Sequence, residues 1–183
     1  MKTSLALLGA AILISGTAGI AKDEPYLSAT HKILGHRAQT SQQHAQDQAQ
    51  TLYYYSQSQQ PVPKQEAKEL VAGIRRDLAA SQKALAALKA EYAKNKEAID
   101  LIESIKTHHA KAFELCGMTE EACEKEEGDK VVIGDCCSEM WYELEAARTE
   151  TQKLLKMLKI DKFEPPKKVG VKPGSPKKTD ARN

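Results

Sequence analysis

"CCSEMWYELEAARTETQKLLKML", residues 136–158, is the stretch that decides the fold. Its core positions follow one another at alternating intervals of three and four residues: Cys137, Met140, Leu144, Ala147, Thr151, Leu154 and Leu158. This spacing puts the seven side chains on one face of an α-helix, as packing in a helical bundle requires. The stretch therefore predicts a helix near residues 136–160 that packs against other helices.

A second seam, with a seven-residue repeat, runs through residues 64–116. Its two series of mostly apolar positions are Val71, Leu78, Leu85, Tyr92, Ile99, Lys106 and Phe113, and Ile74, Ser81, Leu88, Asn95, Ile102, His109 and Cys116. A single helix over this range would be about 80 Å long, at about 1.5 Å per residue, and would leave its partners at opposite ends. A break near "AKNKE", residues 93–97, gives helices near 63–93 and 97–116 instead. We favour the break, with one long helix as the alternative.

Residues 27–57 repeat the same spacing with more polar side chains. The series is Leu27, His31, Leu34, Ala38, Ser41, Ala45, Gln48, Leu52 and Tyr55. The prolines of "QQPVPKQEA", residues 59–67, end this helix because proline lacks the backbone donor and restricts the residue before it. Four helices of this kind predict an all-α fold, an antiparallel four-helix bundle, with long helical hairpins as the alternative.

Both ends of the chain differ from the helical part. Residues 1–21 combine a basic start with an uncharged apolar run and small residues, which is typical of a signal peptide cleaved after Ala21, with Ala18 as the competing site and a retained anchor as the alternative. We therefore expect a periplasmic or secreted protein with a bundle domain over residues 22–160 and no membrane span after cleavage. Residues 161–183 are rich in lysine and proline, which predicts a disordered tail.

The four cysteines lie close together in the sequence, between residues 116 and 137. In an exported protein such a cluster indicates disulfides, of which three connectivities exist. Cys116 and Cys137 both fall on core positions where two predicted helices meet, which favours Cys116–Cys137 and leaves Cys123–Cys136 as the second bridge. Each bridge would stabilise the fold by about 3 kcal/mol.

The histidines suggest a metal site, which is the one chemical function that the sequence indicates. In the four-helix arrangement His108 and His109 lie level with about residue 40, so His36, His44 and Asp47 bracket their height. Imidazole and carboxylate ligands on facing helices can hold a divalent transition metal such as copper, zinc or nickel. The alternative is that these are partly exposed helix histidines, with His109 hydrogen-bonded in the core.

Three segments resemble small exported bacterial helical proteins that are often richer in histidine and have no assigned activity. They are "HAQDQAQTLYYYSQSQQPVPKQEAKELVAGIRRDLAASQKAL", "HHAKAFELC" and "CCSEMWYELEAARTETQKLLKML". The resemblance spans roughly residues 36–158 and implies an exported helical fold. It carries over no functional residues.

Two functions remain open from the sequence. No Ser-His-Asp or Cys-His arrangement and no glycine-rich phosphate loop is present, so we expect no enzymatic activity. The tail has too few basic residues and no interleaved aromatics for nucleic acid. One hypothesis is a structural or interaction module of the cell envelope, with a protein or envelope partner or a second copy of the chain, to which the tyrosines of "LYYYS", residues 52–56, could contribute. The other is a metal-binding bundle that uses the histidines.

Overall fold

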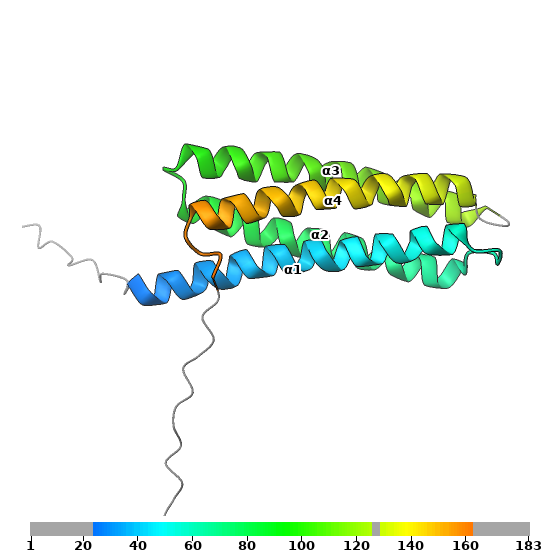
Figure 1. Ribbon diagram of the computed structural model, residues 1–183, viewed down its shortest axis with the longest axis horizontal. Helices are drawn as coiled ribbons and strands as arrows, with labels where there is room; N and C mark the ends of the chain where they lie inside the picture. The colour runs from blue at the N-terminus through cyan, green and yellow to red at the C-terminus, as the bar shows by residue number, and fades with distance from the viewer. Residues whose placement is uncertain (1–23, 126–128, 163–183) are drawn as a thin grey trace, which may run out of the picture.

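Four helices make up the part of the protein that the structure describes. The computed structural model describes residues 24–125 and 129–162, and these ranges contain no strand. The helices are α1 (Glu24–Gln57), α2 (Lys64–Glu91), α3 (Lys96–Glu124) and α4 (Lys130–Met157). They run alternately up and down side by side (Figure 1). This confirms the all-α bundle, while the predicted signal peptide and almost all of the predicted tail lie outside the described residues.

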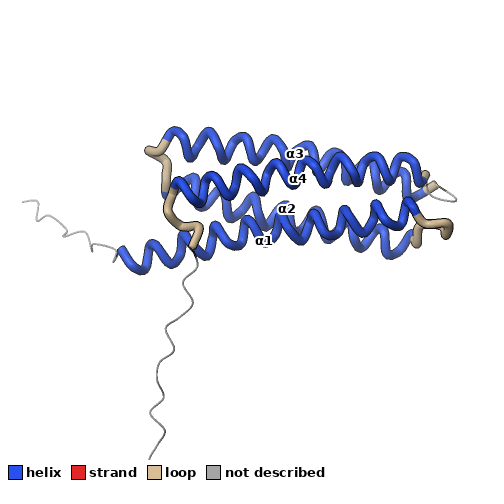
Figure 2. Tube along the Cα trace, in the orientation of Figure 1, coloured by secondary structure: helices blue, strands red, loops and turns tan. Residues whose placement is uncertain are grey.

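Local sequence signals set the helix boundaries. Pro63 precedes α2, and its carbonyl accepts the first helical bond from Ala67 N at 2.9 Å. The side chain of Asn95 caps α3 by accepting a hydrogen bond from Ala98 N at 3.1 Å. The tight turn at residues 92–95 confirms the predicted break between the two middle helices (Figure 2).

The link between α3 and α4 is much shorter than the sequence predicts. We expected helices to end at 116 and resume at 136, but α3 continues to Glu124 and α4 begins at Lys130. Packing overrides the low helix propensity of glycine here. A Cβ on Gly134 would stand only 2.9 Å from Ser56 Oγ, so glycine permits the close approach of α4 to α1.

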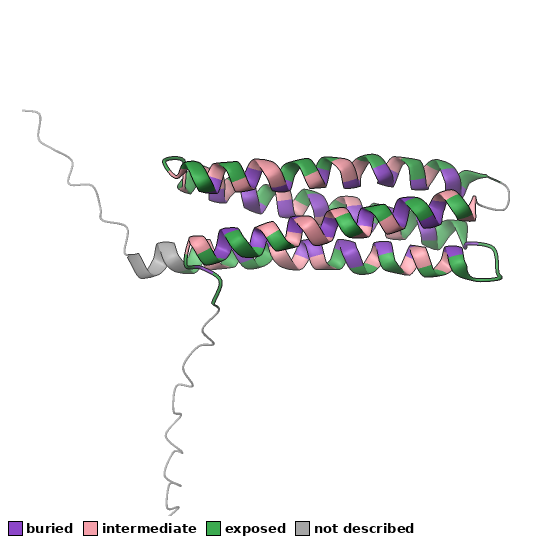
Figure 3. Ribbon diagram, turned by 45° about the horizontal axis from the view of Figure 1, so that its top comes forward, coloured by how far each residue is buried: buried purple, intermediate pink, exposed green. Residues whose placement is uncertain are grey.

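Each helix packs against two neighbours in the cycle α1, α2, α3, α4. Buried positions recur along the length of every helix and form an interrupted stripe (Figure 3). On α1 this stripe keeps the intervals of four and three but includes glutamine: Ala38, Gln42, Ala45, Ala49, Leu52 and Ser56. Of the predicted positions His31, Leu34, Gln48 and Tyr55 are only partly buried. The polar character of α1 therefore extends into the core.

Two apolar clusters fill the interior. The first lies toward the α1–α2 turn and includes Leu52, Ile74, Leu78, Met140 and all four cysteines. The second lies toward the α2–α3 turn and includes Leu85, Leu88, Ile102, Ile105 and Leu154. The residues between the clusters are polar, and they form the centre of the bundle.

Candidate functional site

His109 lies at the centre of the bundle, fully buried. The side-chain amide of Gln42 donates to His109 Nε2 and to Thr151 Oγ1, each at 3.0 Å. These bonds join α1, α3 and α4. Because Nε2 accepts, the imidazole is neutral and carries its proton on Nδ1. The structure therefore agrees with the alternative interpretation of His109 as a hydrogen-bonded core residue.

Ser81 of α2 adds a fourth buried polar side chain near this level, and we call the four residues Gln42, Ser81, His109 and Thr151 the polar layer. Gln42 Oε1, Ser81 Oγ and His109 Nδ1 are buried and have no hydrogen-bond partner among the described residues. Each such atom costs about 1–3 kcal/mol. The polar layer thus separates the two apolar clusters at a cost in stability.

Burial also controls the charge of His109. Removal from water, together with the charge of the adjacent His108, lowers the pKa of His109 from 6.5 to about 4. The ring is therefore neutral at neutral pH and cannot take up a proton without destabilising the core.

His108 points toward α4 instead of the core. Its Nδ1 lies 2.6 Å from Glu143 Oε2, and its Nε2 lies 3.9 Å from Glu150 Oε1. The two carboxylates meet opposite sides of the ring, so they do not converge on one point where a metal could sit. His108 links α3 to α4 through contacts with these two glutamates.

The predicted ligands on α1 lie elsewhere. His36 and His44 are exposed and line one shallow groove on the surface of α1, together with Ile33 and Arg37. Asp47 accepts a hydrogen bond from Gln43 Nε2 at 2.7 Å on the same helix. Within residues 24–125 and 129–162, no group of three or more histidine, cysteine or acidic side chains is placed to hold a metal ion. The structure does not assemble the predicted histidine site.

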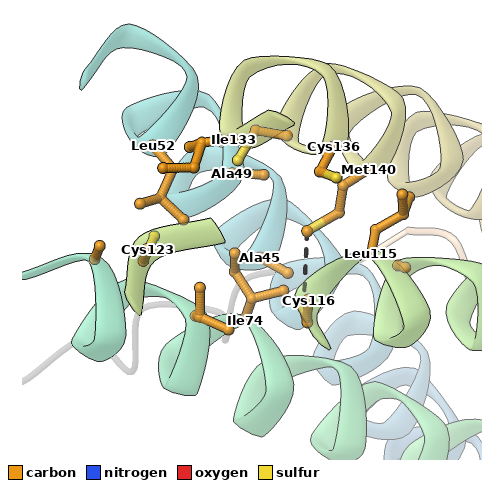
Figure 4. Packing of buried hydrophobic residues seen from close by; sticks show 14 of the residues in the cluster. Ala45, Ala49, Leu52, Ile74, Leu115, Cys116, Cys123, Ile133, Cys136 and Met140 are labelled. Carbon is orange, nitrogen blue, oxygen red and sulfur yellow. Dashed lines mark hydrogen bonds between the residues drawn. The ribbon is translucent and has the colours of Figure 1, made fainter. Parts of the chain in front are cut away.

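The cysteines contradict the predicted disulfides. All four are buried free thiols. Cys116 and Cys137 are fully buried, as their seam positions predicted, but the Cys116 thiol donates to Met140 Sδ at 3.9 Å (Figure 4). Thr119, one turn further along α3, lies beside the thiols of Cys136 and Cys137. In this register Cys116 contacts Met140, while Cys136 and Cys137 contact Thr119, and no disulfide joins the thiols although Cys137 lies near the other three.

The buried thiols are poorly suited to nucleophilic chemistry. Burial raises the pKa of Cys116 and of Cys137 to about 12. The pKa of Cys123 and of Cys136 is raised as well, mainly by burial and further by nearby carboxylates. Since the thiolate is the reactive form, these side chains are unreactive at neutral pH.

An aromatic surface lies over the seam between α1 and α4. Tyr53 and Tyr54 of α1 and Trp141 and Tyr142 of α4 line a pocket of about 220 Å³, with Cys137 buried at its base. The rings of Trp141 and Tyr142 meet edge to face, with centroids 5.3 Å apart. Tyr54 and Tyr142 are 62% and 67% exposed, so large apolar area faces solvent. We call these four residues the aromatic surface.

Carboxylates border the aromatic surface on both helices. Glu145 follows Trp141 and Tyr142 by four and three positions on α4, and Asp47 precedes Tyr54 by seven on α1, so each shares a face with the rings. From Lys130 to Arg148 the chain carries four acids and no other basic residue. Glu145 is ion-paired with Arg148 at 2.8 Å, so the border of the pocket carries charges of both signs. The tyrosine run at residues 52–56 suggested partner contacts from the sequence alone. Trp141 and Tyr142 belong to the same surface only because α4 packs beside α1, which the sequence does not show.

Comparison with known proteins adds no relative. No family model, no curated protein and no solved structure matches the chain. In the part of the chain that the structure describes, no helix has both the length and the apolar character of a membrane span. Functional interpretation therefore depends on the geometry of the bundle.

Proposed function

We propose that the protein is an exported interaction module of the cell envelope, without enzymatic activity, that binds a partner protein through the aromatic surface. The observation that carries this proposal is the exposure of Tyr54 and Tyr142 on either side of one pocket. A few residues supply most of the binding energy at protein interfaces, and tyrosine and tryptophan are enriched among them. A monomeric bundle has no need to leave such rings in water.

Part of the border of the aromatic surface favours a basic partner segment. Asp47 is exposed beside the rings, whereas Glu145 is already paired with Arg148, and lysine or arginine side chains bind both carboxylates and aromatic faces. A second copy of this chain would present such a segment in its basic tail, residues 161–183. The polar layer and the unreactive thiols support a scaffold role for the interior rather than catalysis.

Site-specific photo-cross-linking tests the proposal. A benzophenone side chain is introduced at Tyr142, and at exposed Arg76 of α2 as the matched control. We expect one defined product at position 142, of a mass that identifies a partner or a second copy, and none at 76. The product should be lost in the variant Asp47→Lys, Glu145→Lys, whose fold is checked by circular dichroism. Equal yields at positions 142 and 76, or a yield unaffected by charge reversal, would contradict the proposal.

A further inference from the structure

The last described residues lie on the seam between α1 and α4. After α4, Lys159 has a positive φ of 57°, and the Ile160 amide donates to the Leu155 carbonyl at 2.9 Å, as in a Schellman cap. Ile160 is buried beside Gly35 of α1. Figure 1 shows this segment passing from the end of α4 to α1. The tail therefore starts on the same seam that carries the aromatic surface.

The aromatic surface lies within reach of one part of the tail. Tyr54 follows Gly35 by 19 residues on α1, which is about 28 Å at about 1.5 Å per residue. A proline-rich segment extends by about 3.1 Å per residue, so from Ile160 the chain spans about 16 Å to Pro165 and about 40 Å to Pro173. Pro173 can therefore reach the aromatic rings, whereas Pro165 falls short of them.

The segment at this distance has the composition of a ligand for aromatic grooves. It reads "KPGSPKK", residues 172–178. Pro173 and Pro176 are three residues apart, which puts both on one side of a polyproline II helix because that helix has three residues per turn. Segments with this PxxP spacing dock in grooves lined by aromatic side chains. The pocket of about 220 Å³ that Tyr54 and Tyr142 help to line offers such rings.

Two exposed aspartates flank the pocket, Asp47 on α1 and Asp135 on α4. Each precedes by three positions a residue that lines the pocket, so each lies on the same face of its helix. The other charges at the border, Glu145 and Arg148, already neutralise each other. The two aspartates are therefore the groups that favour lysine at the pocket.

The spacing of the two aspartates matches the spacing of lysines in the tail. The hydrogen bond from Gln46 to Glu145, at 3.0 Å, fixes which levels of α1 and α4 lie side by side. Counting from that level puts the two aspartates about 14 Å apart along the bundle. Lys172 and Lys177, on either side of the PxxP segment, are about 16 Å apart in a polyproline II helix. Both lysines can thus pair with an aspartate while the prolines between them cover the rings.

We propose that residues 172–178 dock on the aromatic surface of their own chain. This inference rests on the binding role of the aromatic surface in the proposed function, and it adds regulation: the tail covers the rings until a partner displaces it. The chain's own tail is favoured over the tail of a second copy, because a short linker gives an effective concentration in the millimolar range.

Trp141 is the single tryptophan of the chain and belongs to the aromatic surface, so its fluorescence reports the docking. Acrylamide quenching is measured on the mature wild type, on the double variant Pro173→Ala, Pro176→Ala, and on the matched control Pro165→Ala, Pro166→Ala. We expect the protection of Trp141 from the quencher to be lost in the first variant and kept in the control. Protection in the wild type should be independent of protein concentration, because the contact forms within one chain.

Equal quenching in the wild type and in Pro173→Ala, Pro176→Ala would overturn the proposal, and so would an equal loss of protection in the control. Protection that disappears on dilution would assign the surface to the tail of a second copy and would also overturn it.

Photo-cross-linking from position 142 separates this inference from the proposed function. If both hold, the yield of the partner product should rise in Pro173→Ala, Pro176→Ala, because the tail no longer competes. A partner product together with equal quenching in all three proteins would remove only the tail contact. Protection of Trp141 that depends on the two prolines, without any partner product, would keep the tail contact and remove the partner role.

Discussion

Replacing His109 with glutamine should remove the loss of stability that the burial of this ring causes between pH 7 and pH 5. Burial lowers the pKa of His109 to about 4, while the unfolded chain has the ordinary value of 6.5. The unfolded state therefore binds more protons between these values, and the stability that the neutral ring permits is present above pH 6.5 and lost as the pH falls toward 4. With these two pKa values the loss is about 2 kcal/mol between pH 7 and pH 5.

Urea denaturation of the wild type and of His109→Gln at pH 7, 6 and 5 measures this loss of unfolding free energy. The difference in unfolding free energy between the wild type and His109→Gln should move by about 2 kcal/mol across the range, in favour of the variant at low pH. His44→Gln, which changes an exposed histidine of α1, serves as the matched control and should run parallel to the wild type. Parallel curves for the wild type and His109→Gln would refute the buried neutral imidazole.

Three further predictions follow from the fold and the sequence. Leu144→Ala removes a fully buried side chain and should cost about 2–5 kcal/mol in urea denaturation; a cost below 1 kcal/mol would show a loose core. Asn95→Ala removes the cap on Ala98 N and should lower the unfolding free energy by about 1 kcal/mol, whereas Asn95→Asp should retain it. N-terminal sequencing of the exported protein should begin at Lys22, and a protein still starting at Met1 would contradict export by a cleaved signal.

The fold could be predicted because the seam positions are strongly periodic. The α4 seam appears in the structure with six of its seven positions, from Cys137 to Leu154, fully buried. The placement of residues 108 and 109 level with about residue 40 also holds, since His109 contacts Gln42. Helix order and approximate height follow from sequence intervals alone, because all four helices rise at the same rate.

The sequence of α1 does not identify Gln42 as the hydrogen-bond partner of His109. The predicted series ran from Ala38 through Ser41 to Ala45 and therefore did not include Gln42. Gln42 is buried because His109 and Thr151 meet it from two other helices. That reason is tertiary, so α1 taken alone could not reveal it.

The sulfur chemistry could not be predicted because it depends on register. Sequence intervals place Cys116 and Cys137 on facing sides of neighbouring helices, and both face the core as expected. They do not state the axial offset between α3 and α4, which is set by the five residues that link Glu124 to Lys130. A loop of that length brings Met140 beside Cys116.

The oxidation state of the four cysteines is the most direct test of the packing between α3 and α4. The contact between Cys116 and Met140 and the lack of disulfides both require free thiols at Cys116 and its neighbours. Exported protein can be denatured without reductant, alkylated and weighed by mass spectrometry. Because all four cysteines are free thiols, we expect a mass increase of four alkyl groups per chain. An increase of none or two, with Cys116 joined to another cysteine, would contradict it.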